Sequence, residues 1–514
     1  MPSSPHSLPI GIKILRVIWP SCDSLSQTTR YKASVLVLTY LAYMSYHLSR
    51  RPLSIVKTVL HRNCTGLIPD PGTDISDPCW CCWKPFDKDN ANSLLGFLDS
   101  SFLISYALFM FISGFIAERC HLRYFLALGM VFSGIFTYLL GLAYYFDIHN
   151  IYYFILIQIL AGACQTTGWP AVVAAMGHWF PKSSRGLIFG IWNSHTNVGN
   201  ILGAVIAGAF VEYNWGLSFI VPGLIIACVG FLHFLFLVPY PEEIGLTTAD
   251  IEIESGNRPT SIEDNNQRGS VSNQDQTNSH RRKTKRPISN SDIDEEVPLI
   301  GEVEINDNRA VSFLSALKIP GVIEFSLSLF FCKLVSYTFL YWLPKYLDDS
   351  TGISAMESAY SSTPFDIGGA IGAIGAGIIA DRTGAPGLTC IFMLFLTLPG
   401  LIAYELLGTF NKWSNLIFQA ILGLFVNGPY ALITTAVAAD LGNKVTTSKA
   451  LATVTAIIDG TGSIGAAVGP FIAGIVSQNG WNNVFYMVMI SDLISLCFLA
   501  RIGAAEWRKI RNTP

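Results

Sequence analysis

Long apolar runs recur along this chain, and they constrain its fold more than any other feature. Of the 514 residues, 51% are hydrophobic and only 13% are charged, whereas a soluble protein carries about 25% charged residues. A helix of about 20 apolar residues is long enough to cross the roughly 30 Å hydrocarbon core of a bilayer. The sequence therefore predicts an all-α integral membrane protein that crosses the bilayer many times.

We predict two groups of six membrane spans, separated by a polar linker. The spans are expected at 33–56, 93–117, 123–146, 151–178, 186–210, 217–238, 320–346, 358–380, 387–407, 414–438, 450–476 and 483–503. Within the linker, residues 242–312 are rich in Asp, Glu, Asn, Ser and Arg and bury too little apolar surface to fold. The predicted order is a cytoplasmic N-terminus 1–32, a six-helix bundle 33–238 with a lumenal loop 57–92, a cytoplasmic disordered linker 239–319, a second bundle 320–503 and a cytoplasmic tail 504–514.

The two groups of spans carry related motifs. "GFIAER" (114–119) ends the second span and "GIIADR" (377–382) ends the eighth. A longer set keeps one constant offset: Gly199, Gly203, Ile206, Ala207, Gly208, Trp215 and Phe219 recur as Gly465, Gly469, Ile472, Ala473, Gly474, Trp481 and Phe485. Such repeats are typical of transporters, whose substrate site lies near the bilayer midplane where the halves meet.

The loop after the first span is expected to face an oxidising compartment. Basic residues are more frequent on the side that both termini share, which places the termini in the cytoplasm and this loop opposite. Asn63 of the sequon "NCT" is then a candidate for glycosylation. The run "CWCC" lacks the paired C-x-x-C spacing of a zinc site, so we expect no metal. One or two disulfides can form, with the pairing left open, among Cys64, Cys79, Cys81 and Cys82.

Three basic residues lie well inside predicted spans: Arg50, Arg51 and Lys333. A cation at the bilayer centre costs about 2.5–3.5 kcal/mol on insertion scales, so each needs a function or a partner. Lys333 lies in the first span of the second half, which we take as the place of Arg50 in the repeat.

A polar stripe runs along the first span. Tyr43, Tyr46, His47 and Arg50 follow the i, i+3, i+4, i+7 spacing of one helical face. This face is expected to line an aqueous path. Arg51 points about 100° away and is expected to pair with an acid or to approach the outer interface.

One cation from each half, Arg50 and Lys333, would clamp an anion between the halves. An arginine fork suits phosphate, and two cations match a phosphate monoester with a charge near −2. The alternative is that the cations only hold helices together by pairing with buried acids, namely Asp99, Asp366 or Asp459. Groups able to bind sugar hydroxyls are expected around the clamp at Tyr106, Gln165, Asn193, His195, Asn197 and Asn427.

Five segments resemble the sugar-phosphate exchanger family of the major facilitator superfamily: "QTTGWP" (165–170), "GIWNSHTNVGN" (190–200), "YTFLYWLPKYL" (337–347), "NGPYALITTA" (427–436) and "DGTGSIGAAVGP" (459–470). The resemblance is to the eukaryotic branch, which includes glucose-6-phosphate/phosphate exchangers of the endoplasmic reticulum, and it covers nearly all of 30–503 except the linker. It implies the major facilitator fold, with twelve transmembrane helices in two pseudo-symmetric halves. It also implies that the partners are a sugar phosphate, glucose 6-phosphate above all, and inorganic phosphate.

The resemblance implies roles for single residues. Arg50 in "YHLSR" falls on the phosphate-gripping arginine of the first helix. Tyr106 and Asn193 fall on site-lining positions, and Asp366 falls on a buried acid of the eighth helix.

Two positions depart from the family pattern. The second arginine of the bacterial relatives falls on Ser336, with Lys333 one turn earlier as its substitute. The site histidine falls on Thr196, and His195 beside it is rotated by about 100°.

Alternating access gives a hypothesis for exchange. In the empty carrier, Arg50 and Lys333 repel each other and disfavour the occluded state. A bound phosphate screens both charges, so the halves close around it and reopen on the other face. Because only the loaded carrier closes easily, the cycle is an exchange.

Two further sets of residues are assigned to conformational change. Ion pairs across helix ends, which would act as a latch for the outward-facing state, are expected from Glu118, Arg119, Asp381 and Arg382. Close helix approach, or plain packing, is expected at Gly368, Gly369, Gly372, Gly375 and Gly377.

Other functions explain fewer of these features. The sequence contains no nucleotide-binding loop, metal-ligand cluster or catalytic triad, so we expect no enzyme, no cofactor and no nucleic-acid partner. A proton-coupled sugar carrier would leave both cations without a role, and a non-transporting sugar-phosphate sensor would bind without flux. We expect the endoplasmic reticulum membrane, with the endolysosomal membrane as the alternative because "DEEVPLI" (294–300) resembles an acidic dileucine signal.

Overall fold

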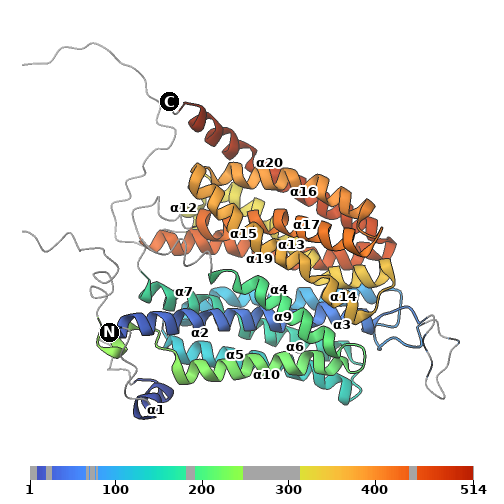
Figure 1. Cartoon of the computed structure of the whole chain (residues 1–514), viewed down its shortest axis with the longest axis horizontal. Helices are drawn as coiled ribbons and strands as arrows, with labels where there is room; N and C mark the ends of the chain where they lie inside the picture. The colour runs from blue at the N-terminus through green and yellow to red at the C-terminus, as the bar shows by residue number, and fades with distance from the viewer. Residues whose placement is uncertain are drawn as a thin grey trace, which may run out of the picture.

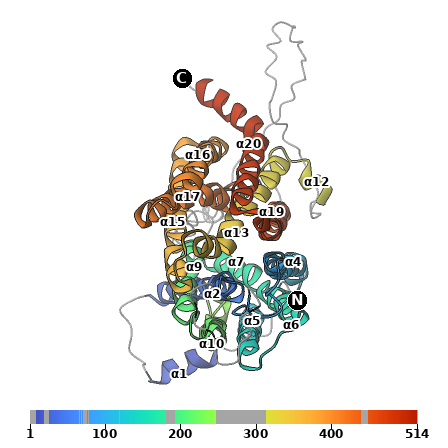
Figure 2. The same ribbon diagram turned by 90° about the vertical axis from the view of Figure 1, so that its right-hand side faces the viewer.

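The computed structural model describes residues 8–18, 26–64, 67, 69, 76, 79–117, 119–180, 192–246, 313–438, 441 and 448–512. Within these residues the regular structure is helical and no strand occurs. The helices of the first half of the chain gather on one side of the molecule and those of the second half on the other (Figures 1 and 2). Most of the linker predicted at 239–319 lies outside the described residues.

The first half is built from α1 (Ile10–Ile18), α2 (Gln27–Arg50), α3 (Pro52–Leu60), α4 (Ala91–Ala117), α5 (Leu122–Tyr145), α6 (Ile151–Gln165), α7 (Gly168–Trp179), α9 (His195–Phe210), α10 (Trp215–Phe236) and the short 3₁₀ helix η2 (Pro241–Ile244). Pro52 stands at the first position of α3. Because proline has no backbone N–H, it divides the first span into α2 and α3 directly after the two arginines. The helix then continues to Leu60, beyond the end predicted at residue 56.

The second half is built from α12 (Phe313–Leu317), α13 (Val322–Thr351), α14 (Ala355–Ser361), α15 (Thr363–Thr383), α16 (Pro386–Leu407), α17 (Lys412–Leu432), the π-helical turn η3 (Ile433–Val437), α19 (Ser448–Val476), the 3₁₀ turn η4 (Ser477–Asn479) and α20 (Trp481–Asn512). Each predicted span overlaps one of these helices or two consecutive ones.

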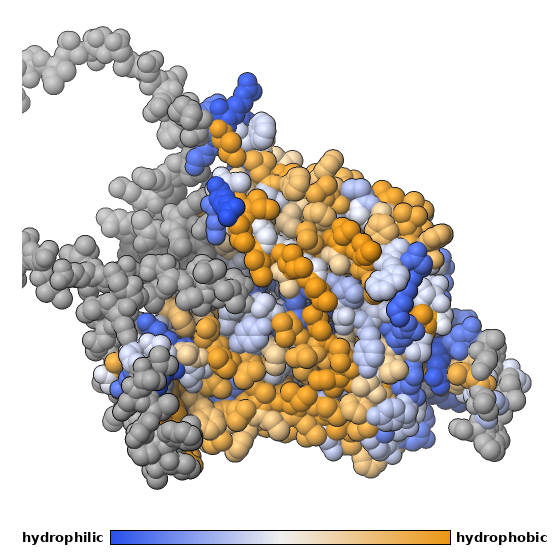
Figure 3. Space-filling view, viewed as in Figure 1, coloured by the Kyte–Doolittle hydropathy of each residue, from blue (hydrophilic) through white to orange (hydrophobic). Residues whose placement is uncertain are grey.

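Ten helical segments of the described chain are long and apolar enough to cross a membrane. The first and fifth predicted spans are not among them. The first carries the polar stripe with Arg50, and the described helix of the fifth, α9, has 16 residues. Hydrophobic side chains dominate the middle of the face seen in Figure 3, and hydrophilic ones gather at its ends, as expected for a bilayer-spanning protein. The chain is thus a multi-pass membrane protein, and the count of twelve remains a prediction.

Repeated glycines reveal the internal symmetry. A Cβ atom at Gly199 of α9 would meet the carbonyl oxygen of Met44 on α2. At the repeated position, a Cβ atom at Gly465 of α19 would meet the carbonyl oxygen of Phe330 on α13. The fifth span of each half therefore packs directly against the first span of that half, because glycine allows two backbones to touch.

The described contacts between the halves gather at the end of the molecule that carries the segment 61–90, which we call the loop end. Near the start of α4, the hydroxyl of Ser100 donates to the Ala467 carbonyl of α19 at 2.8 Å. One turn earlier, a Cβ atom at Gly96 would lie 3.3 Å from the Cα atom of Gly474. The halves are therefore in backbone contact at the loop end.

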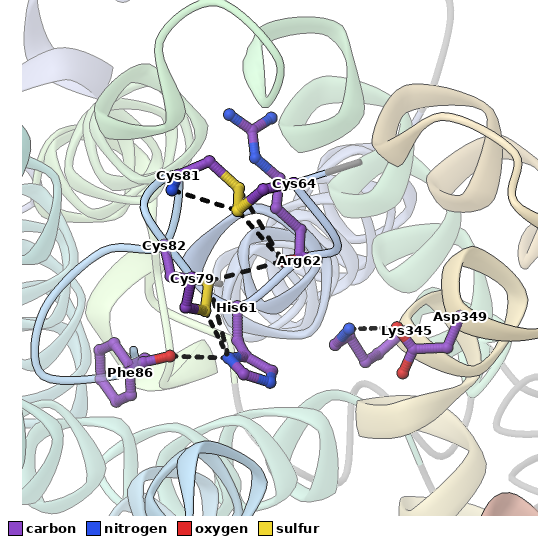
Figure 4. Close-up of a disulfide and its surroundings, with 9 residues drawn as sticks. All are labelled: His61, Arg62, Cys64, Cys79, Cys81, Cys82, Phe86, Lys345 and Asp349. Atoms are coloured by element: carbon purple, nitrogen blue, oxygen red, sulfur yellow. Dashed lines mark hydrogen bonds and ion pairs between the residues drawn. A yellow bond between two sulfur atoms is a disulfide. The ribbon is translucent and has the colours of Figure 1, made fainter. Parts of the chain in front are cut away.

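Two disulfides close the segment 61–90, Cys64–Cys81 and Cys79–Cys82 (Figure 4). The Nδ1–H group of His61 donates to the Phe86 carbonyl at 2.8 Å. Burial lowers the pKa of His61, and the nearby ammonium of Lys345 lowers it further, so the imidazole is neutral at pH 7. The two disulfides give the cysteine pairing that the sequence left open.

Candidate functional site

A cavity of about 680 Å³ lies between the two halves, and we call it the main cavity. Arg50 and Lys333 both line it, together with Asp459. Counting Arg and Lys as +1, Asp as −1 and His as zero, the residues that line the main cavity have a formal net charge of +1. A membrane protein with a net positive cavity between its halves is suited to an anionic substrate.

Arg50 lies at the last position of α2 and reaches the main cavity from the first half. Its Nε–H group donates to the Oε1 atom of Gln165 at 2.6 Å. The guanidinium carbon lies 4.8 Å from the centre of the Tyr106 ring and 5.5 Å from that of Phe102. No carboxylate of the described chain lies within ion-pair distance of Arg50, so its charge is not neutralised by an acid.

Lys333 lies on α13, opposite Arg50, and is already paired. Its Nζ atom lies 2.7 Å from Oδ1 of Asp459 on α19. The contacts of Gly199 and Gly465 bring Met44 into register with Phe330, which puts Lys333 in register with His47 rather than with Arg50. Lys333 is therefore not the repeat equivalent of Arg50 but lies one helical turn before that position. Span boundaries alone do not fix the helical register.

Arg51, the neighbour of Arg50, crosses to the second half instead of facing the main cavity. Its guanidinium donates to the Leu340 carbonyl and, at 3.0 Å, to the hydroxyl of Ser362. Its Nη2 atom also lies 3.7 Å from Oδ2 of Asp366, and the other carboxylate oxygen of Asp366, Oδ1, accepts a hydrogen bond from the Asn200 side-chain amide at 2.9 Å. The expected pairing of Arg51 with an acid is present, and it joins the junction between α2 and α3 to α15.

Asp99 does not line the described cavities and pairs instead with Lys57, a residue that the sequence placed in the loop. Both side chains are fully buried, and the Lys57 ammonium also donates to the Tyr341 carbonyl of α13 at 3.3 Å. Lys57 follows Arg50 by seven residues, so extending the polar stripe by two turns would have identified it.

The amide side chains form a second chamber. A cavity of about 520 Å³, which we call the amide cavity, adjoins the main one because both are lined by His47, Asn193, Thr196, Tyr337, Tyr430 and Ala431. Asn197, Asn427 and Asp366 line the amide cavity, while Tyr106 and His195 line the main one. The structure therefore brings these predicted residues together in two connected chambers.

Besides Asp99, two predicted substrate-binding residues lie outside both chambers. The Tyr46 hydroxyl is 3.2 Å from Oγ1 of Thr167, and its ring packs on Gly168 of α7. Gln165 lines a third cavity of about 320 Å³, which we call the rear cavity; it lies behind Arg50 and is lined by residues of the first half and by Tyr341 of the second.

The sequence reasoning missed several residues that line the chambers, among them Tyr337 and Tyr430. Tyr337 follows Lys333 by one helical turn, so the i, i+4 rule applied to the second cation would have found it. Tyr430 lies 5.5 Å from the Lys333 ammonium, measured to its ring centre, and no spacing signal in the sequence links the two.

The predicted latch falls only partly within the described residues, because Glu118 lies outside them. Arg119 donates to the Phe115 carbonyl at 2.8 Å, and Asp381 and Arg382 are exposed at the end of α15. The latch remains a prediction.

Comparison with known proteins identifies the family. The family model of the Major Facilitator Superfamily matches residues 39–448. The mouse protein named glucose-6-phosphate exchanger SLC37A2 is 49% identical over 506 residues, covering 97% of this chain and 96% of its own. The human protein of that name is 48% identical, with 94% of both chains covered. Human glucose-6-phosphate exchanger SLC37A1 is 42% identical, with 96% of both covered.

Solved structures agree on the fold. A bacterial homologue of the human lysosomal transporter Spinster, in an inward-facing and occupied conformation, superposes with a TM-score of 0.60 at 15% identity, covering 94% of this chain and 97% of its own. A D-xylose–proton symporter superposes with a TM-score of 0.59 at 11% identity, covering 92% and 98%. Three findings lead to one conclusion: the two helical halves, the cavity between them, and the 42% to 49% identity over nearly the full chain. This chain belongs to the major facilitator superfamily, in the family of the glucose-6-phosphate exchangers to which it is similar.

Proposed function

We propose that this chain is an antiporter that exchanges a sugar phosphate, glucose 6-phosphate above all, for inorganic phosphate by alternating access. The observation that carries the proposal is Arg50, a cation in the cavity between the halves without a carboxylate partner in the described chain. A charge held inside a membrane protein is costly unless a ligand of opposite charge completes it. Relatives that are 42% to 49% identical bear the name glucose-6-phosphate exchanger.

In this proposal Arg50 and Lys333 hold the phosphate group. Arg50 offers its charge directly, and its planar fork fits two phosphate oxygens. Lys333 is paired with Asp459 at 2.7 Å and joins the clamp by sharing its three N–H donors between that carboxylate and the phosphate. Both substrates of the exchange carry the phosphate group, so one clamp serves both.

The sugar is proposed to occupy the amide cavity. Asn193, Asn197 and Asn427 line it, and a carboxamide both donates and accepts hydrogen bonds, as a sugar hydroxyl does. His195 and Tyr106 stand at the main cavity beside the clamp. Inorganic phosphate needs only the main cavity, which explains how partners of different size can share one site.

Alternating access follows from the way the halves meet. The described contacts between them lie at the loop end, so in this state the cavity is sealed on that side. Phosphate bound between Arg50 and Lys333 would offset their repulsion and draw the halves together over the cavity. An empty carrier lacks this attraction and closes less readily. Movement of one substrate inward therefore depends on movement of another outward.

We place the protein in the endoplasmic reticulum membrane, with the loop end in the lumen. Two disulfides in the segment 61–90 suit an oxidising compartment, and Asn63 is exposed there for a glycan. Glycosidase treatment is expected to increase the gel mobility of the wild type and to leave that of Asn63→Gln unchanged. This result would support the proposed orientation.

Counterflow in proteoliposomes tests the exchange. Uptake of labelled phosphate is measured with phosphate, glucose 6-phosphate or nothing inside, for the wild type and for Arg50→Ala. Uptake that needs an internal substrate, and that the variant loses while remaining monodisperse, is expected. Uptake indifferent to the internal load would indicate a uniporter or proton-coupled carrier, and binding without uptake would indicate a sensor.

A further inference from the structure

We infer that Gln165 is a positioning residue for Arg50: its neutral amide orients the guanidinium without neutralising the charge that the phosphate must meet. This inference rests on the proposed function and adds to it a rule for how the binding charge is kept available.

Gln165 is held in one orientation by a chain of hydrogen bonds. It is the last residue of α6 and is 2% exposed. Its Oε1 atom accepts from Arg50 Nε at 2.6 Å, and its Nε2 atom donates to the Ser49 hydroxyl at 3.0 Å. That hydroxyl in turn donates to the Tyr46 carbonyl at 2.8 Å. Reversing the amide would set two donors against each other at Arg50, so the network has a single favourable arrangement.

The position of Gln165 separates orientation from substrate contact. Gln165 lines the 320 Å³ cavity behind Arg50, and neither the main nor the amide cavity reaches it. Arg50 lines both this rear cavity and the main one. Gln165 therefore holds the Nε side of the guanidinium and makes no bond to its terminal nitrogens. This differs from our expectation that Gln165 would bind a sugar hydroxyl.

The choice of an amide contrasts with the partners of three buried cations elsewhere in the described chain. Arg51, Lys57 and Lys333 each have a carboxylate partner, respectively Asp366, Asp99 and Asp459. A carboxylate at residue 165 would hold Arg50 equally well, but it would satisfy the charge before phosphate arrived. An amide of the same shape preserves the hydrogen bond and leaves the charge open.

The test compares Gln165→Glu and Gln165→Leu with the wild type and with Gln158→Leu. Gln158 lies two turns earlier on α6, is 7% exposed and lines the same rear cavity, but it bonds to the Leu98 carbonyl instead of Arg50. KM and maximal rate are measured in counterflow for inorganic phosphate and for glucose 6-phosphate.

Gln165→Glu is expected to raise KM by about tenfold or more for both substrates alike, because both meet Arg50 through the phosphate group. Gln165→Leu is expected to raise both values less, since it frees the guanidinium without neutralising it, and Gln158→Leu is expected to keep wild-type KM values. A rise confined to glucose 6-phosphate would overturn the inference in favour of a sugar contact. A fall in maximal rate with unchanged KM would overturn it in favour of a purely structural role.

Two controls keep this result separate from the proposed function. Wild-type protein without counterflow would refute the exchanger itself and not the role of Gln165. If Gln165→Glu does not fold, the rise in Tm produced by inorganic phosphate is compared between wild type and Gln165→Leu. A rise of equal size at equal phosphate concentration would contradict the inference, and a smaller one supports it.

Discussion

Lys57 and Asp99 form an ion pair in which both side chains are fully buried between α3 and α4. The same ammonium donates to the Tyr341 carbonyl at 3.3 Å and lies 3.9 Å from the centre of the Trp342 ring, both on α13 of the other half. One lysine therefore neutralises an acid in its own half and binds the second half at the loop end.

Removal of one partner of this pair is expected to destabilise the protein strongly. Lys57→Met leaves the Asp99 carboxylate buried without a counter-charge, and breaking a buried pair in this way costs about 3–5 kcal/mol. Lys57→Met/Asp99→Leu removes both charges and is expected to recover most of the loss. The Tm values of the three purified proteins check this, and a Lys57→Met variant that melts like the wild type would contradict it.

Periodicity and repetition in the sequence predicted the architecture and much of the site. The constant offset between Gly199 and Gly465 gave the two halves, and both glycines serve the same contact in their own half. The i, i+3, i+4, i+7 stripe predicted that Arg50 faces an aqueous path, and Arg50 lines the main cavity. These features depend on local helical geometry, which a sequence pattern records directly.

Features set by contacts between distant helices could not be predicted in this way. The pairing of Lys57 with Asp99 is one such feature, because Asp99 lies on another helix and no spacing in the sequence links the two residues. The sequence offered three acids as partners of the cations and gave no means to match them. Gln165 was expected beside the sugar, whereas in the structure it bonds to Arg50 and lines the rear cavity.

Arg51 is expected to stabilise the state in which the loop end is closed. Its bonds to Leu340 and Ser362 are made across the halves and must break when that end opens. Arg51→Met should therefore shift the population toward the open state. Spin labels at Tyr213 and Met356, on exposed sites of opposite halves at the loop end, report the distance between them.

The matched control is Arg501→Met, because Arg501 pairs with Glu324 inside the second half at 3.0 Å. We expect a larger fraction of long distances for Arg51→Met and a wild-type distribution for Arg501→Met. Identical distributions for all three proteins would show that Arg51 does not hold the loop end closed.

The glycines of α15 are expected to differ sharply in their tolerance of alanine. A Cβ atom at Gly372 would meet the backbone carbonyl of Leu424, so α15 and α17 would have to separate. A Cβ atom at Gly375 would meet nothing within 4 Å, and alanine favours a helix over glycine by about 1 kcal/mol. Gly372→Ala should lower Tm by several degrees, and Gly375→Ala should leave it unchanged or raise it. Equal effects of both would contradict the close approach of the two helices.

Asp459→Asn is expected to tighten phosphate binding and slow turnover. The substitution removes the only carboxylate that lines the main cavity in the described chain, which raises the formal net charge there from +1 to +2 and frees Lys333. KM for inorganic phosphate in counterflow should fall several-fold, because a stronger field attracts the anion. The maximal rate should fall too, since a more tightly held phosphate leaves more slowly.

Asp492→Asn provides the control for an acid-to-amide change inside the membrane. Asp492 is 2% exposed on α20 and lines neither the main nor the amide cavity, so both kinetic constants should stay at wild-type values. A higher KM for phosphate in Asp459→Asn would reverse the reasoning. It would mean that the ion pair with Asp459 holds Lys333 in the position in which it binds phosphate. The unpaired Lys333 ammonium would then not strengthen phosphate binding.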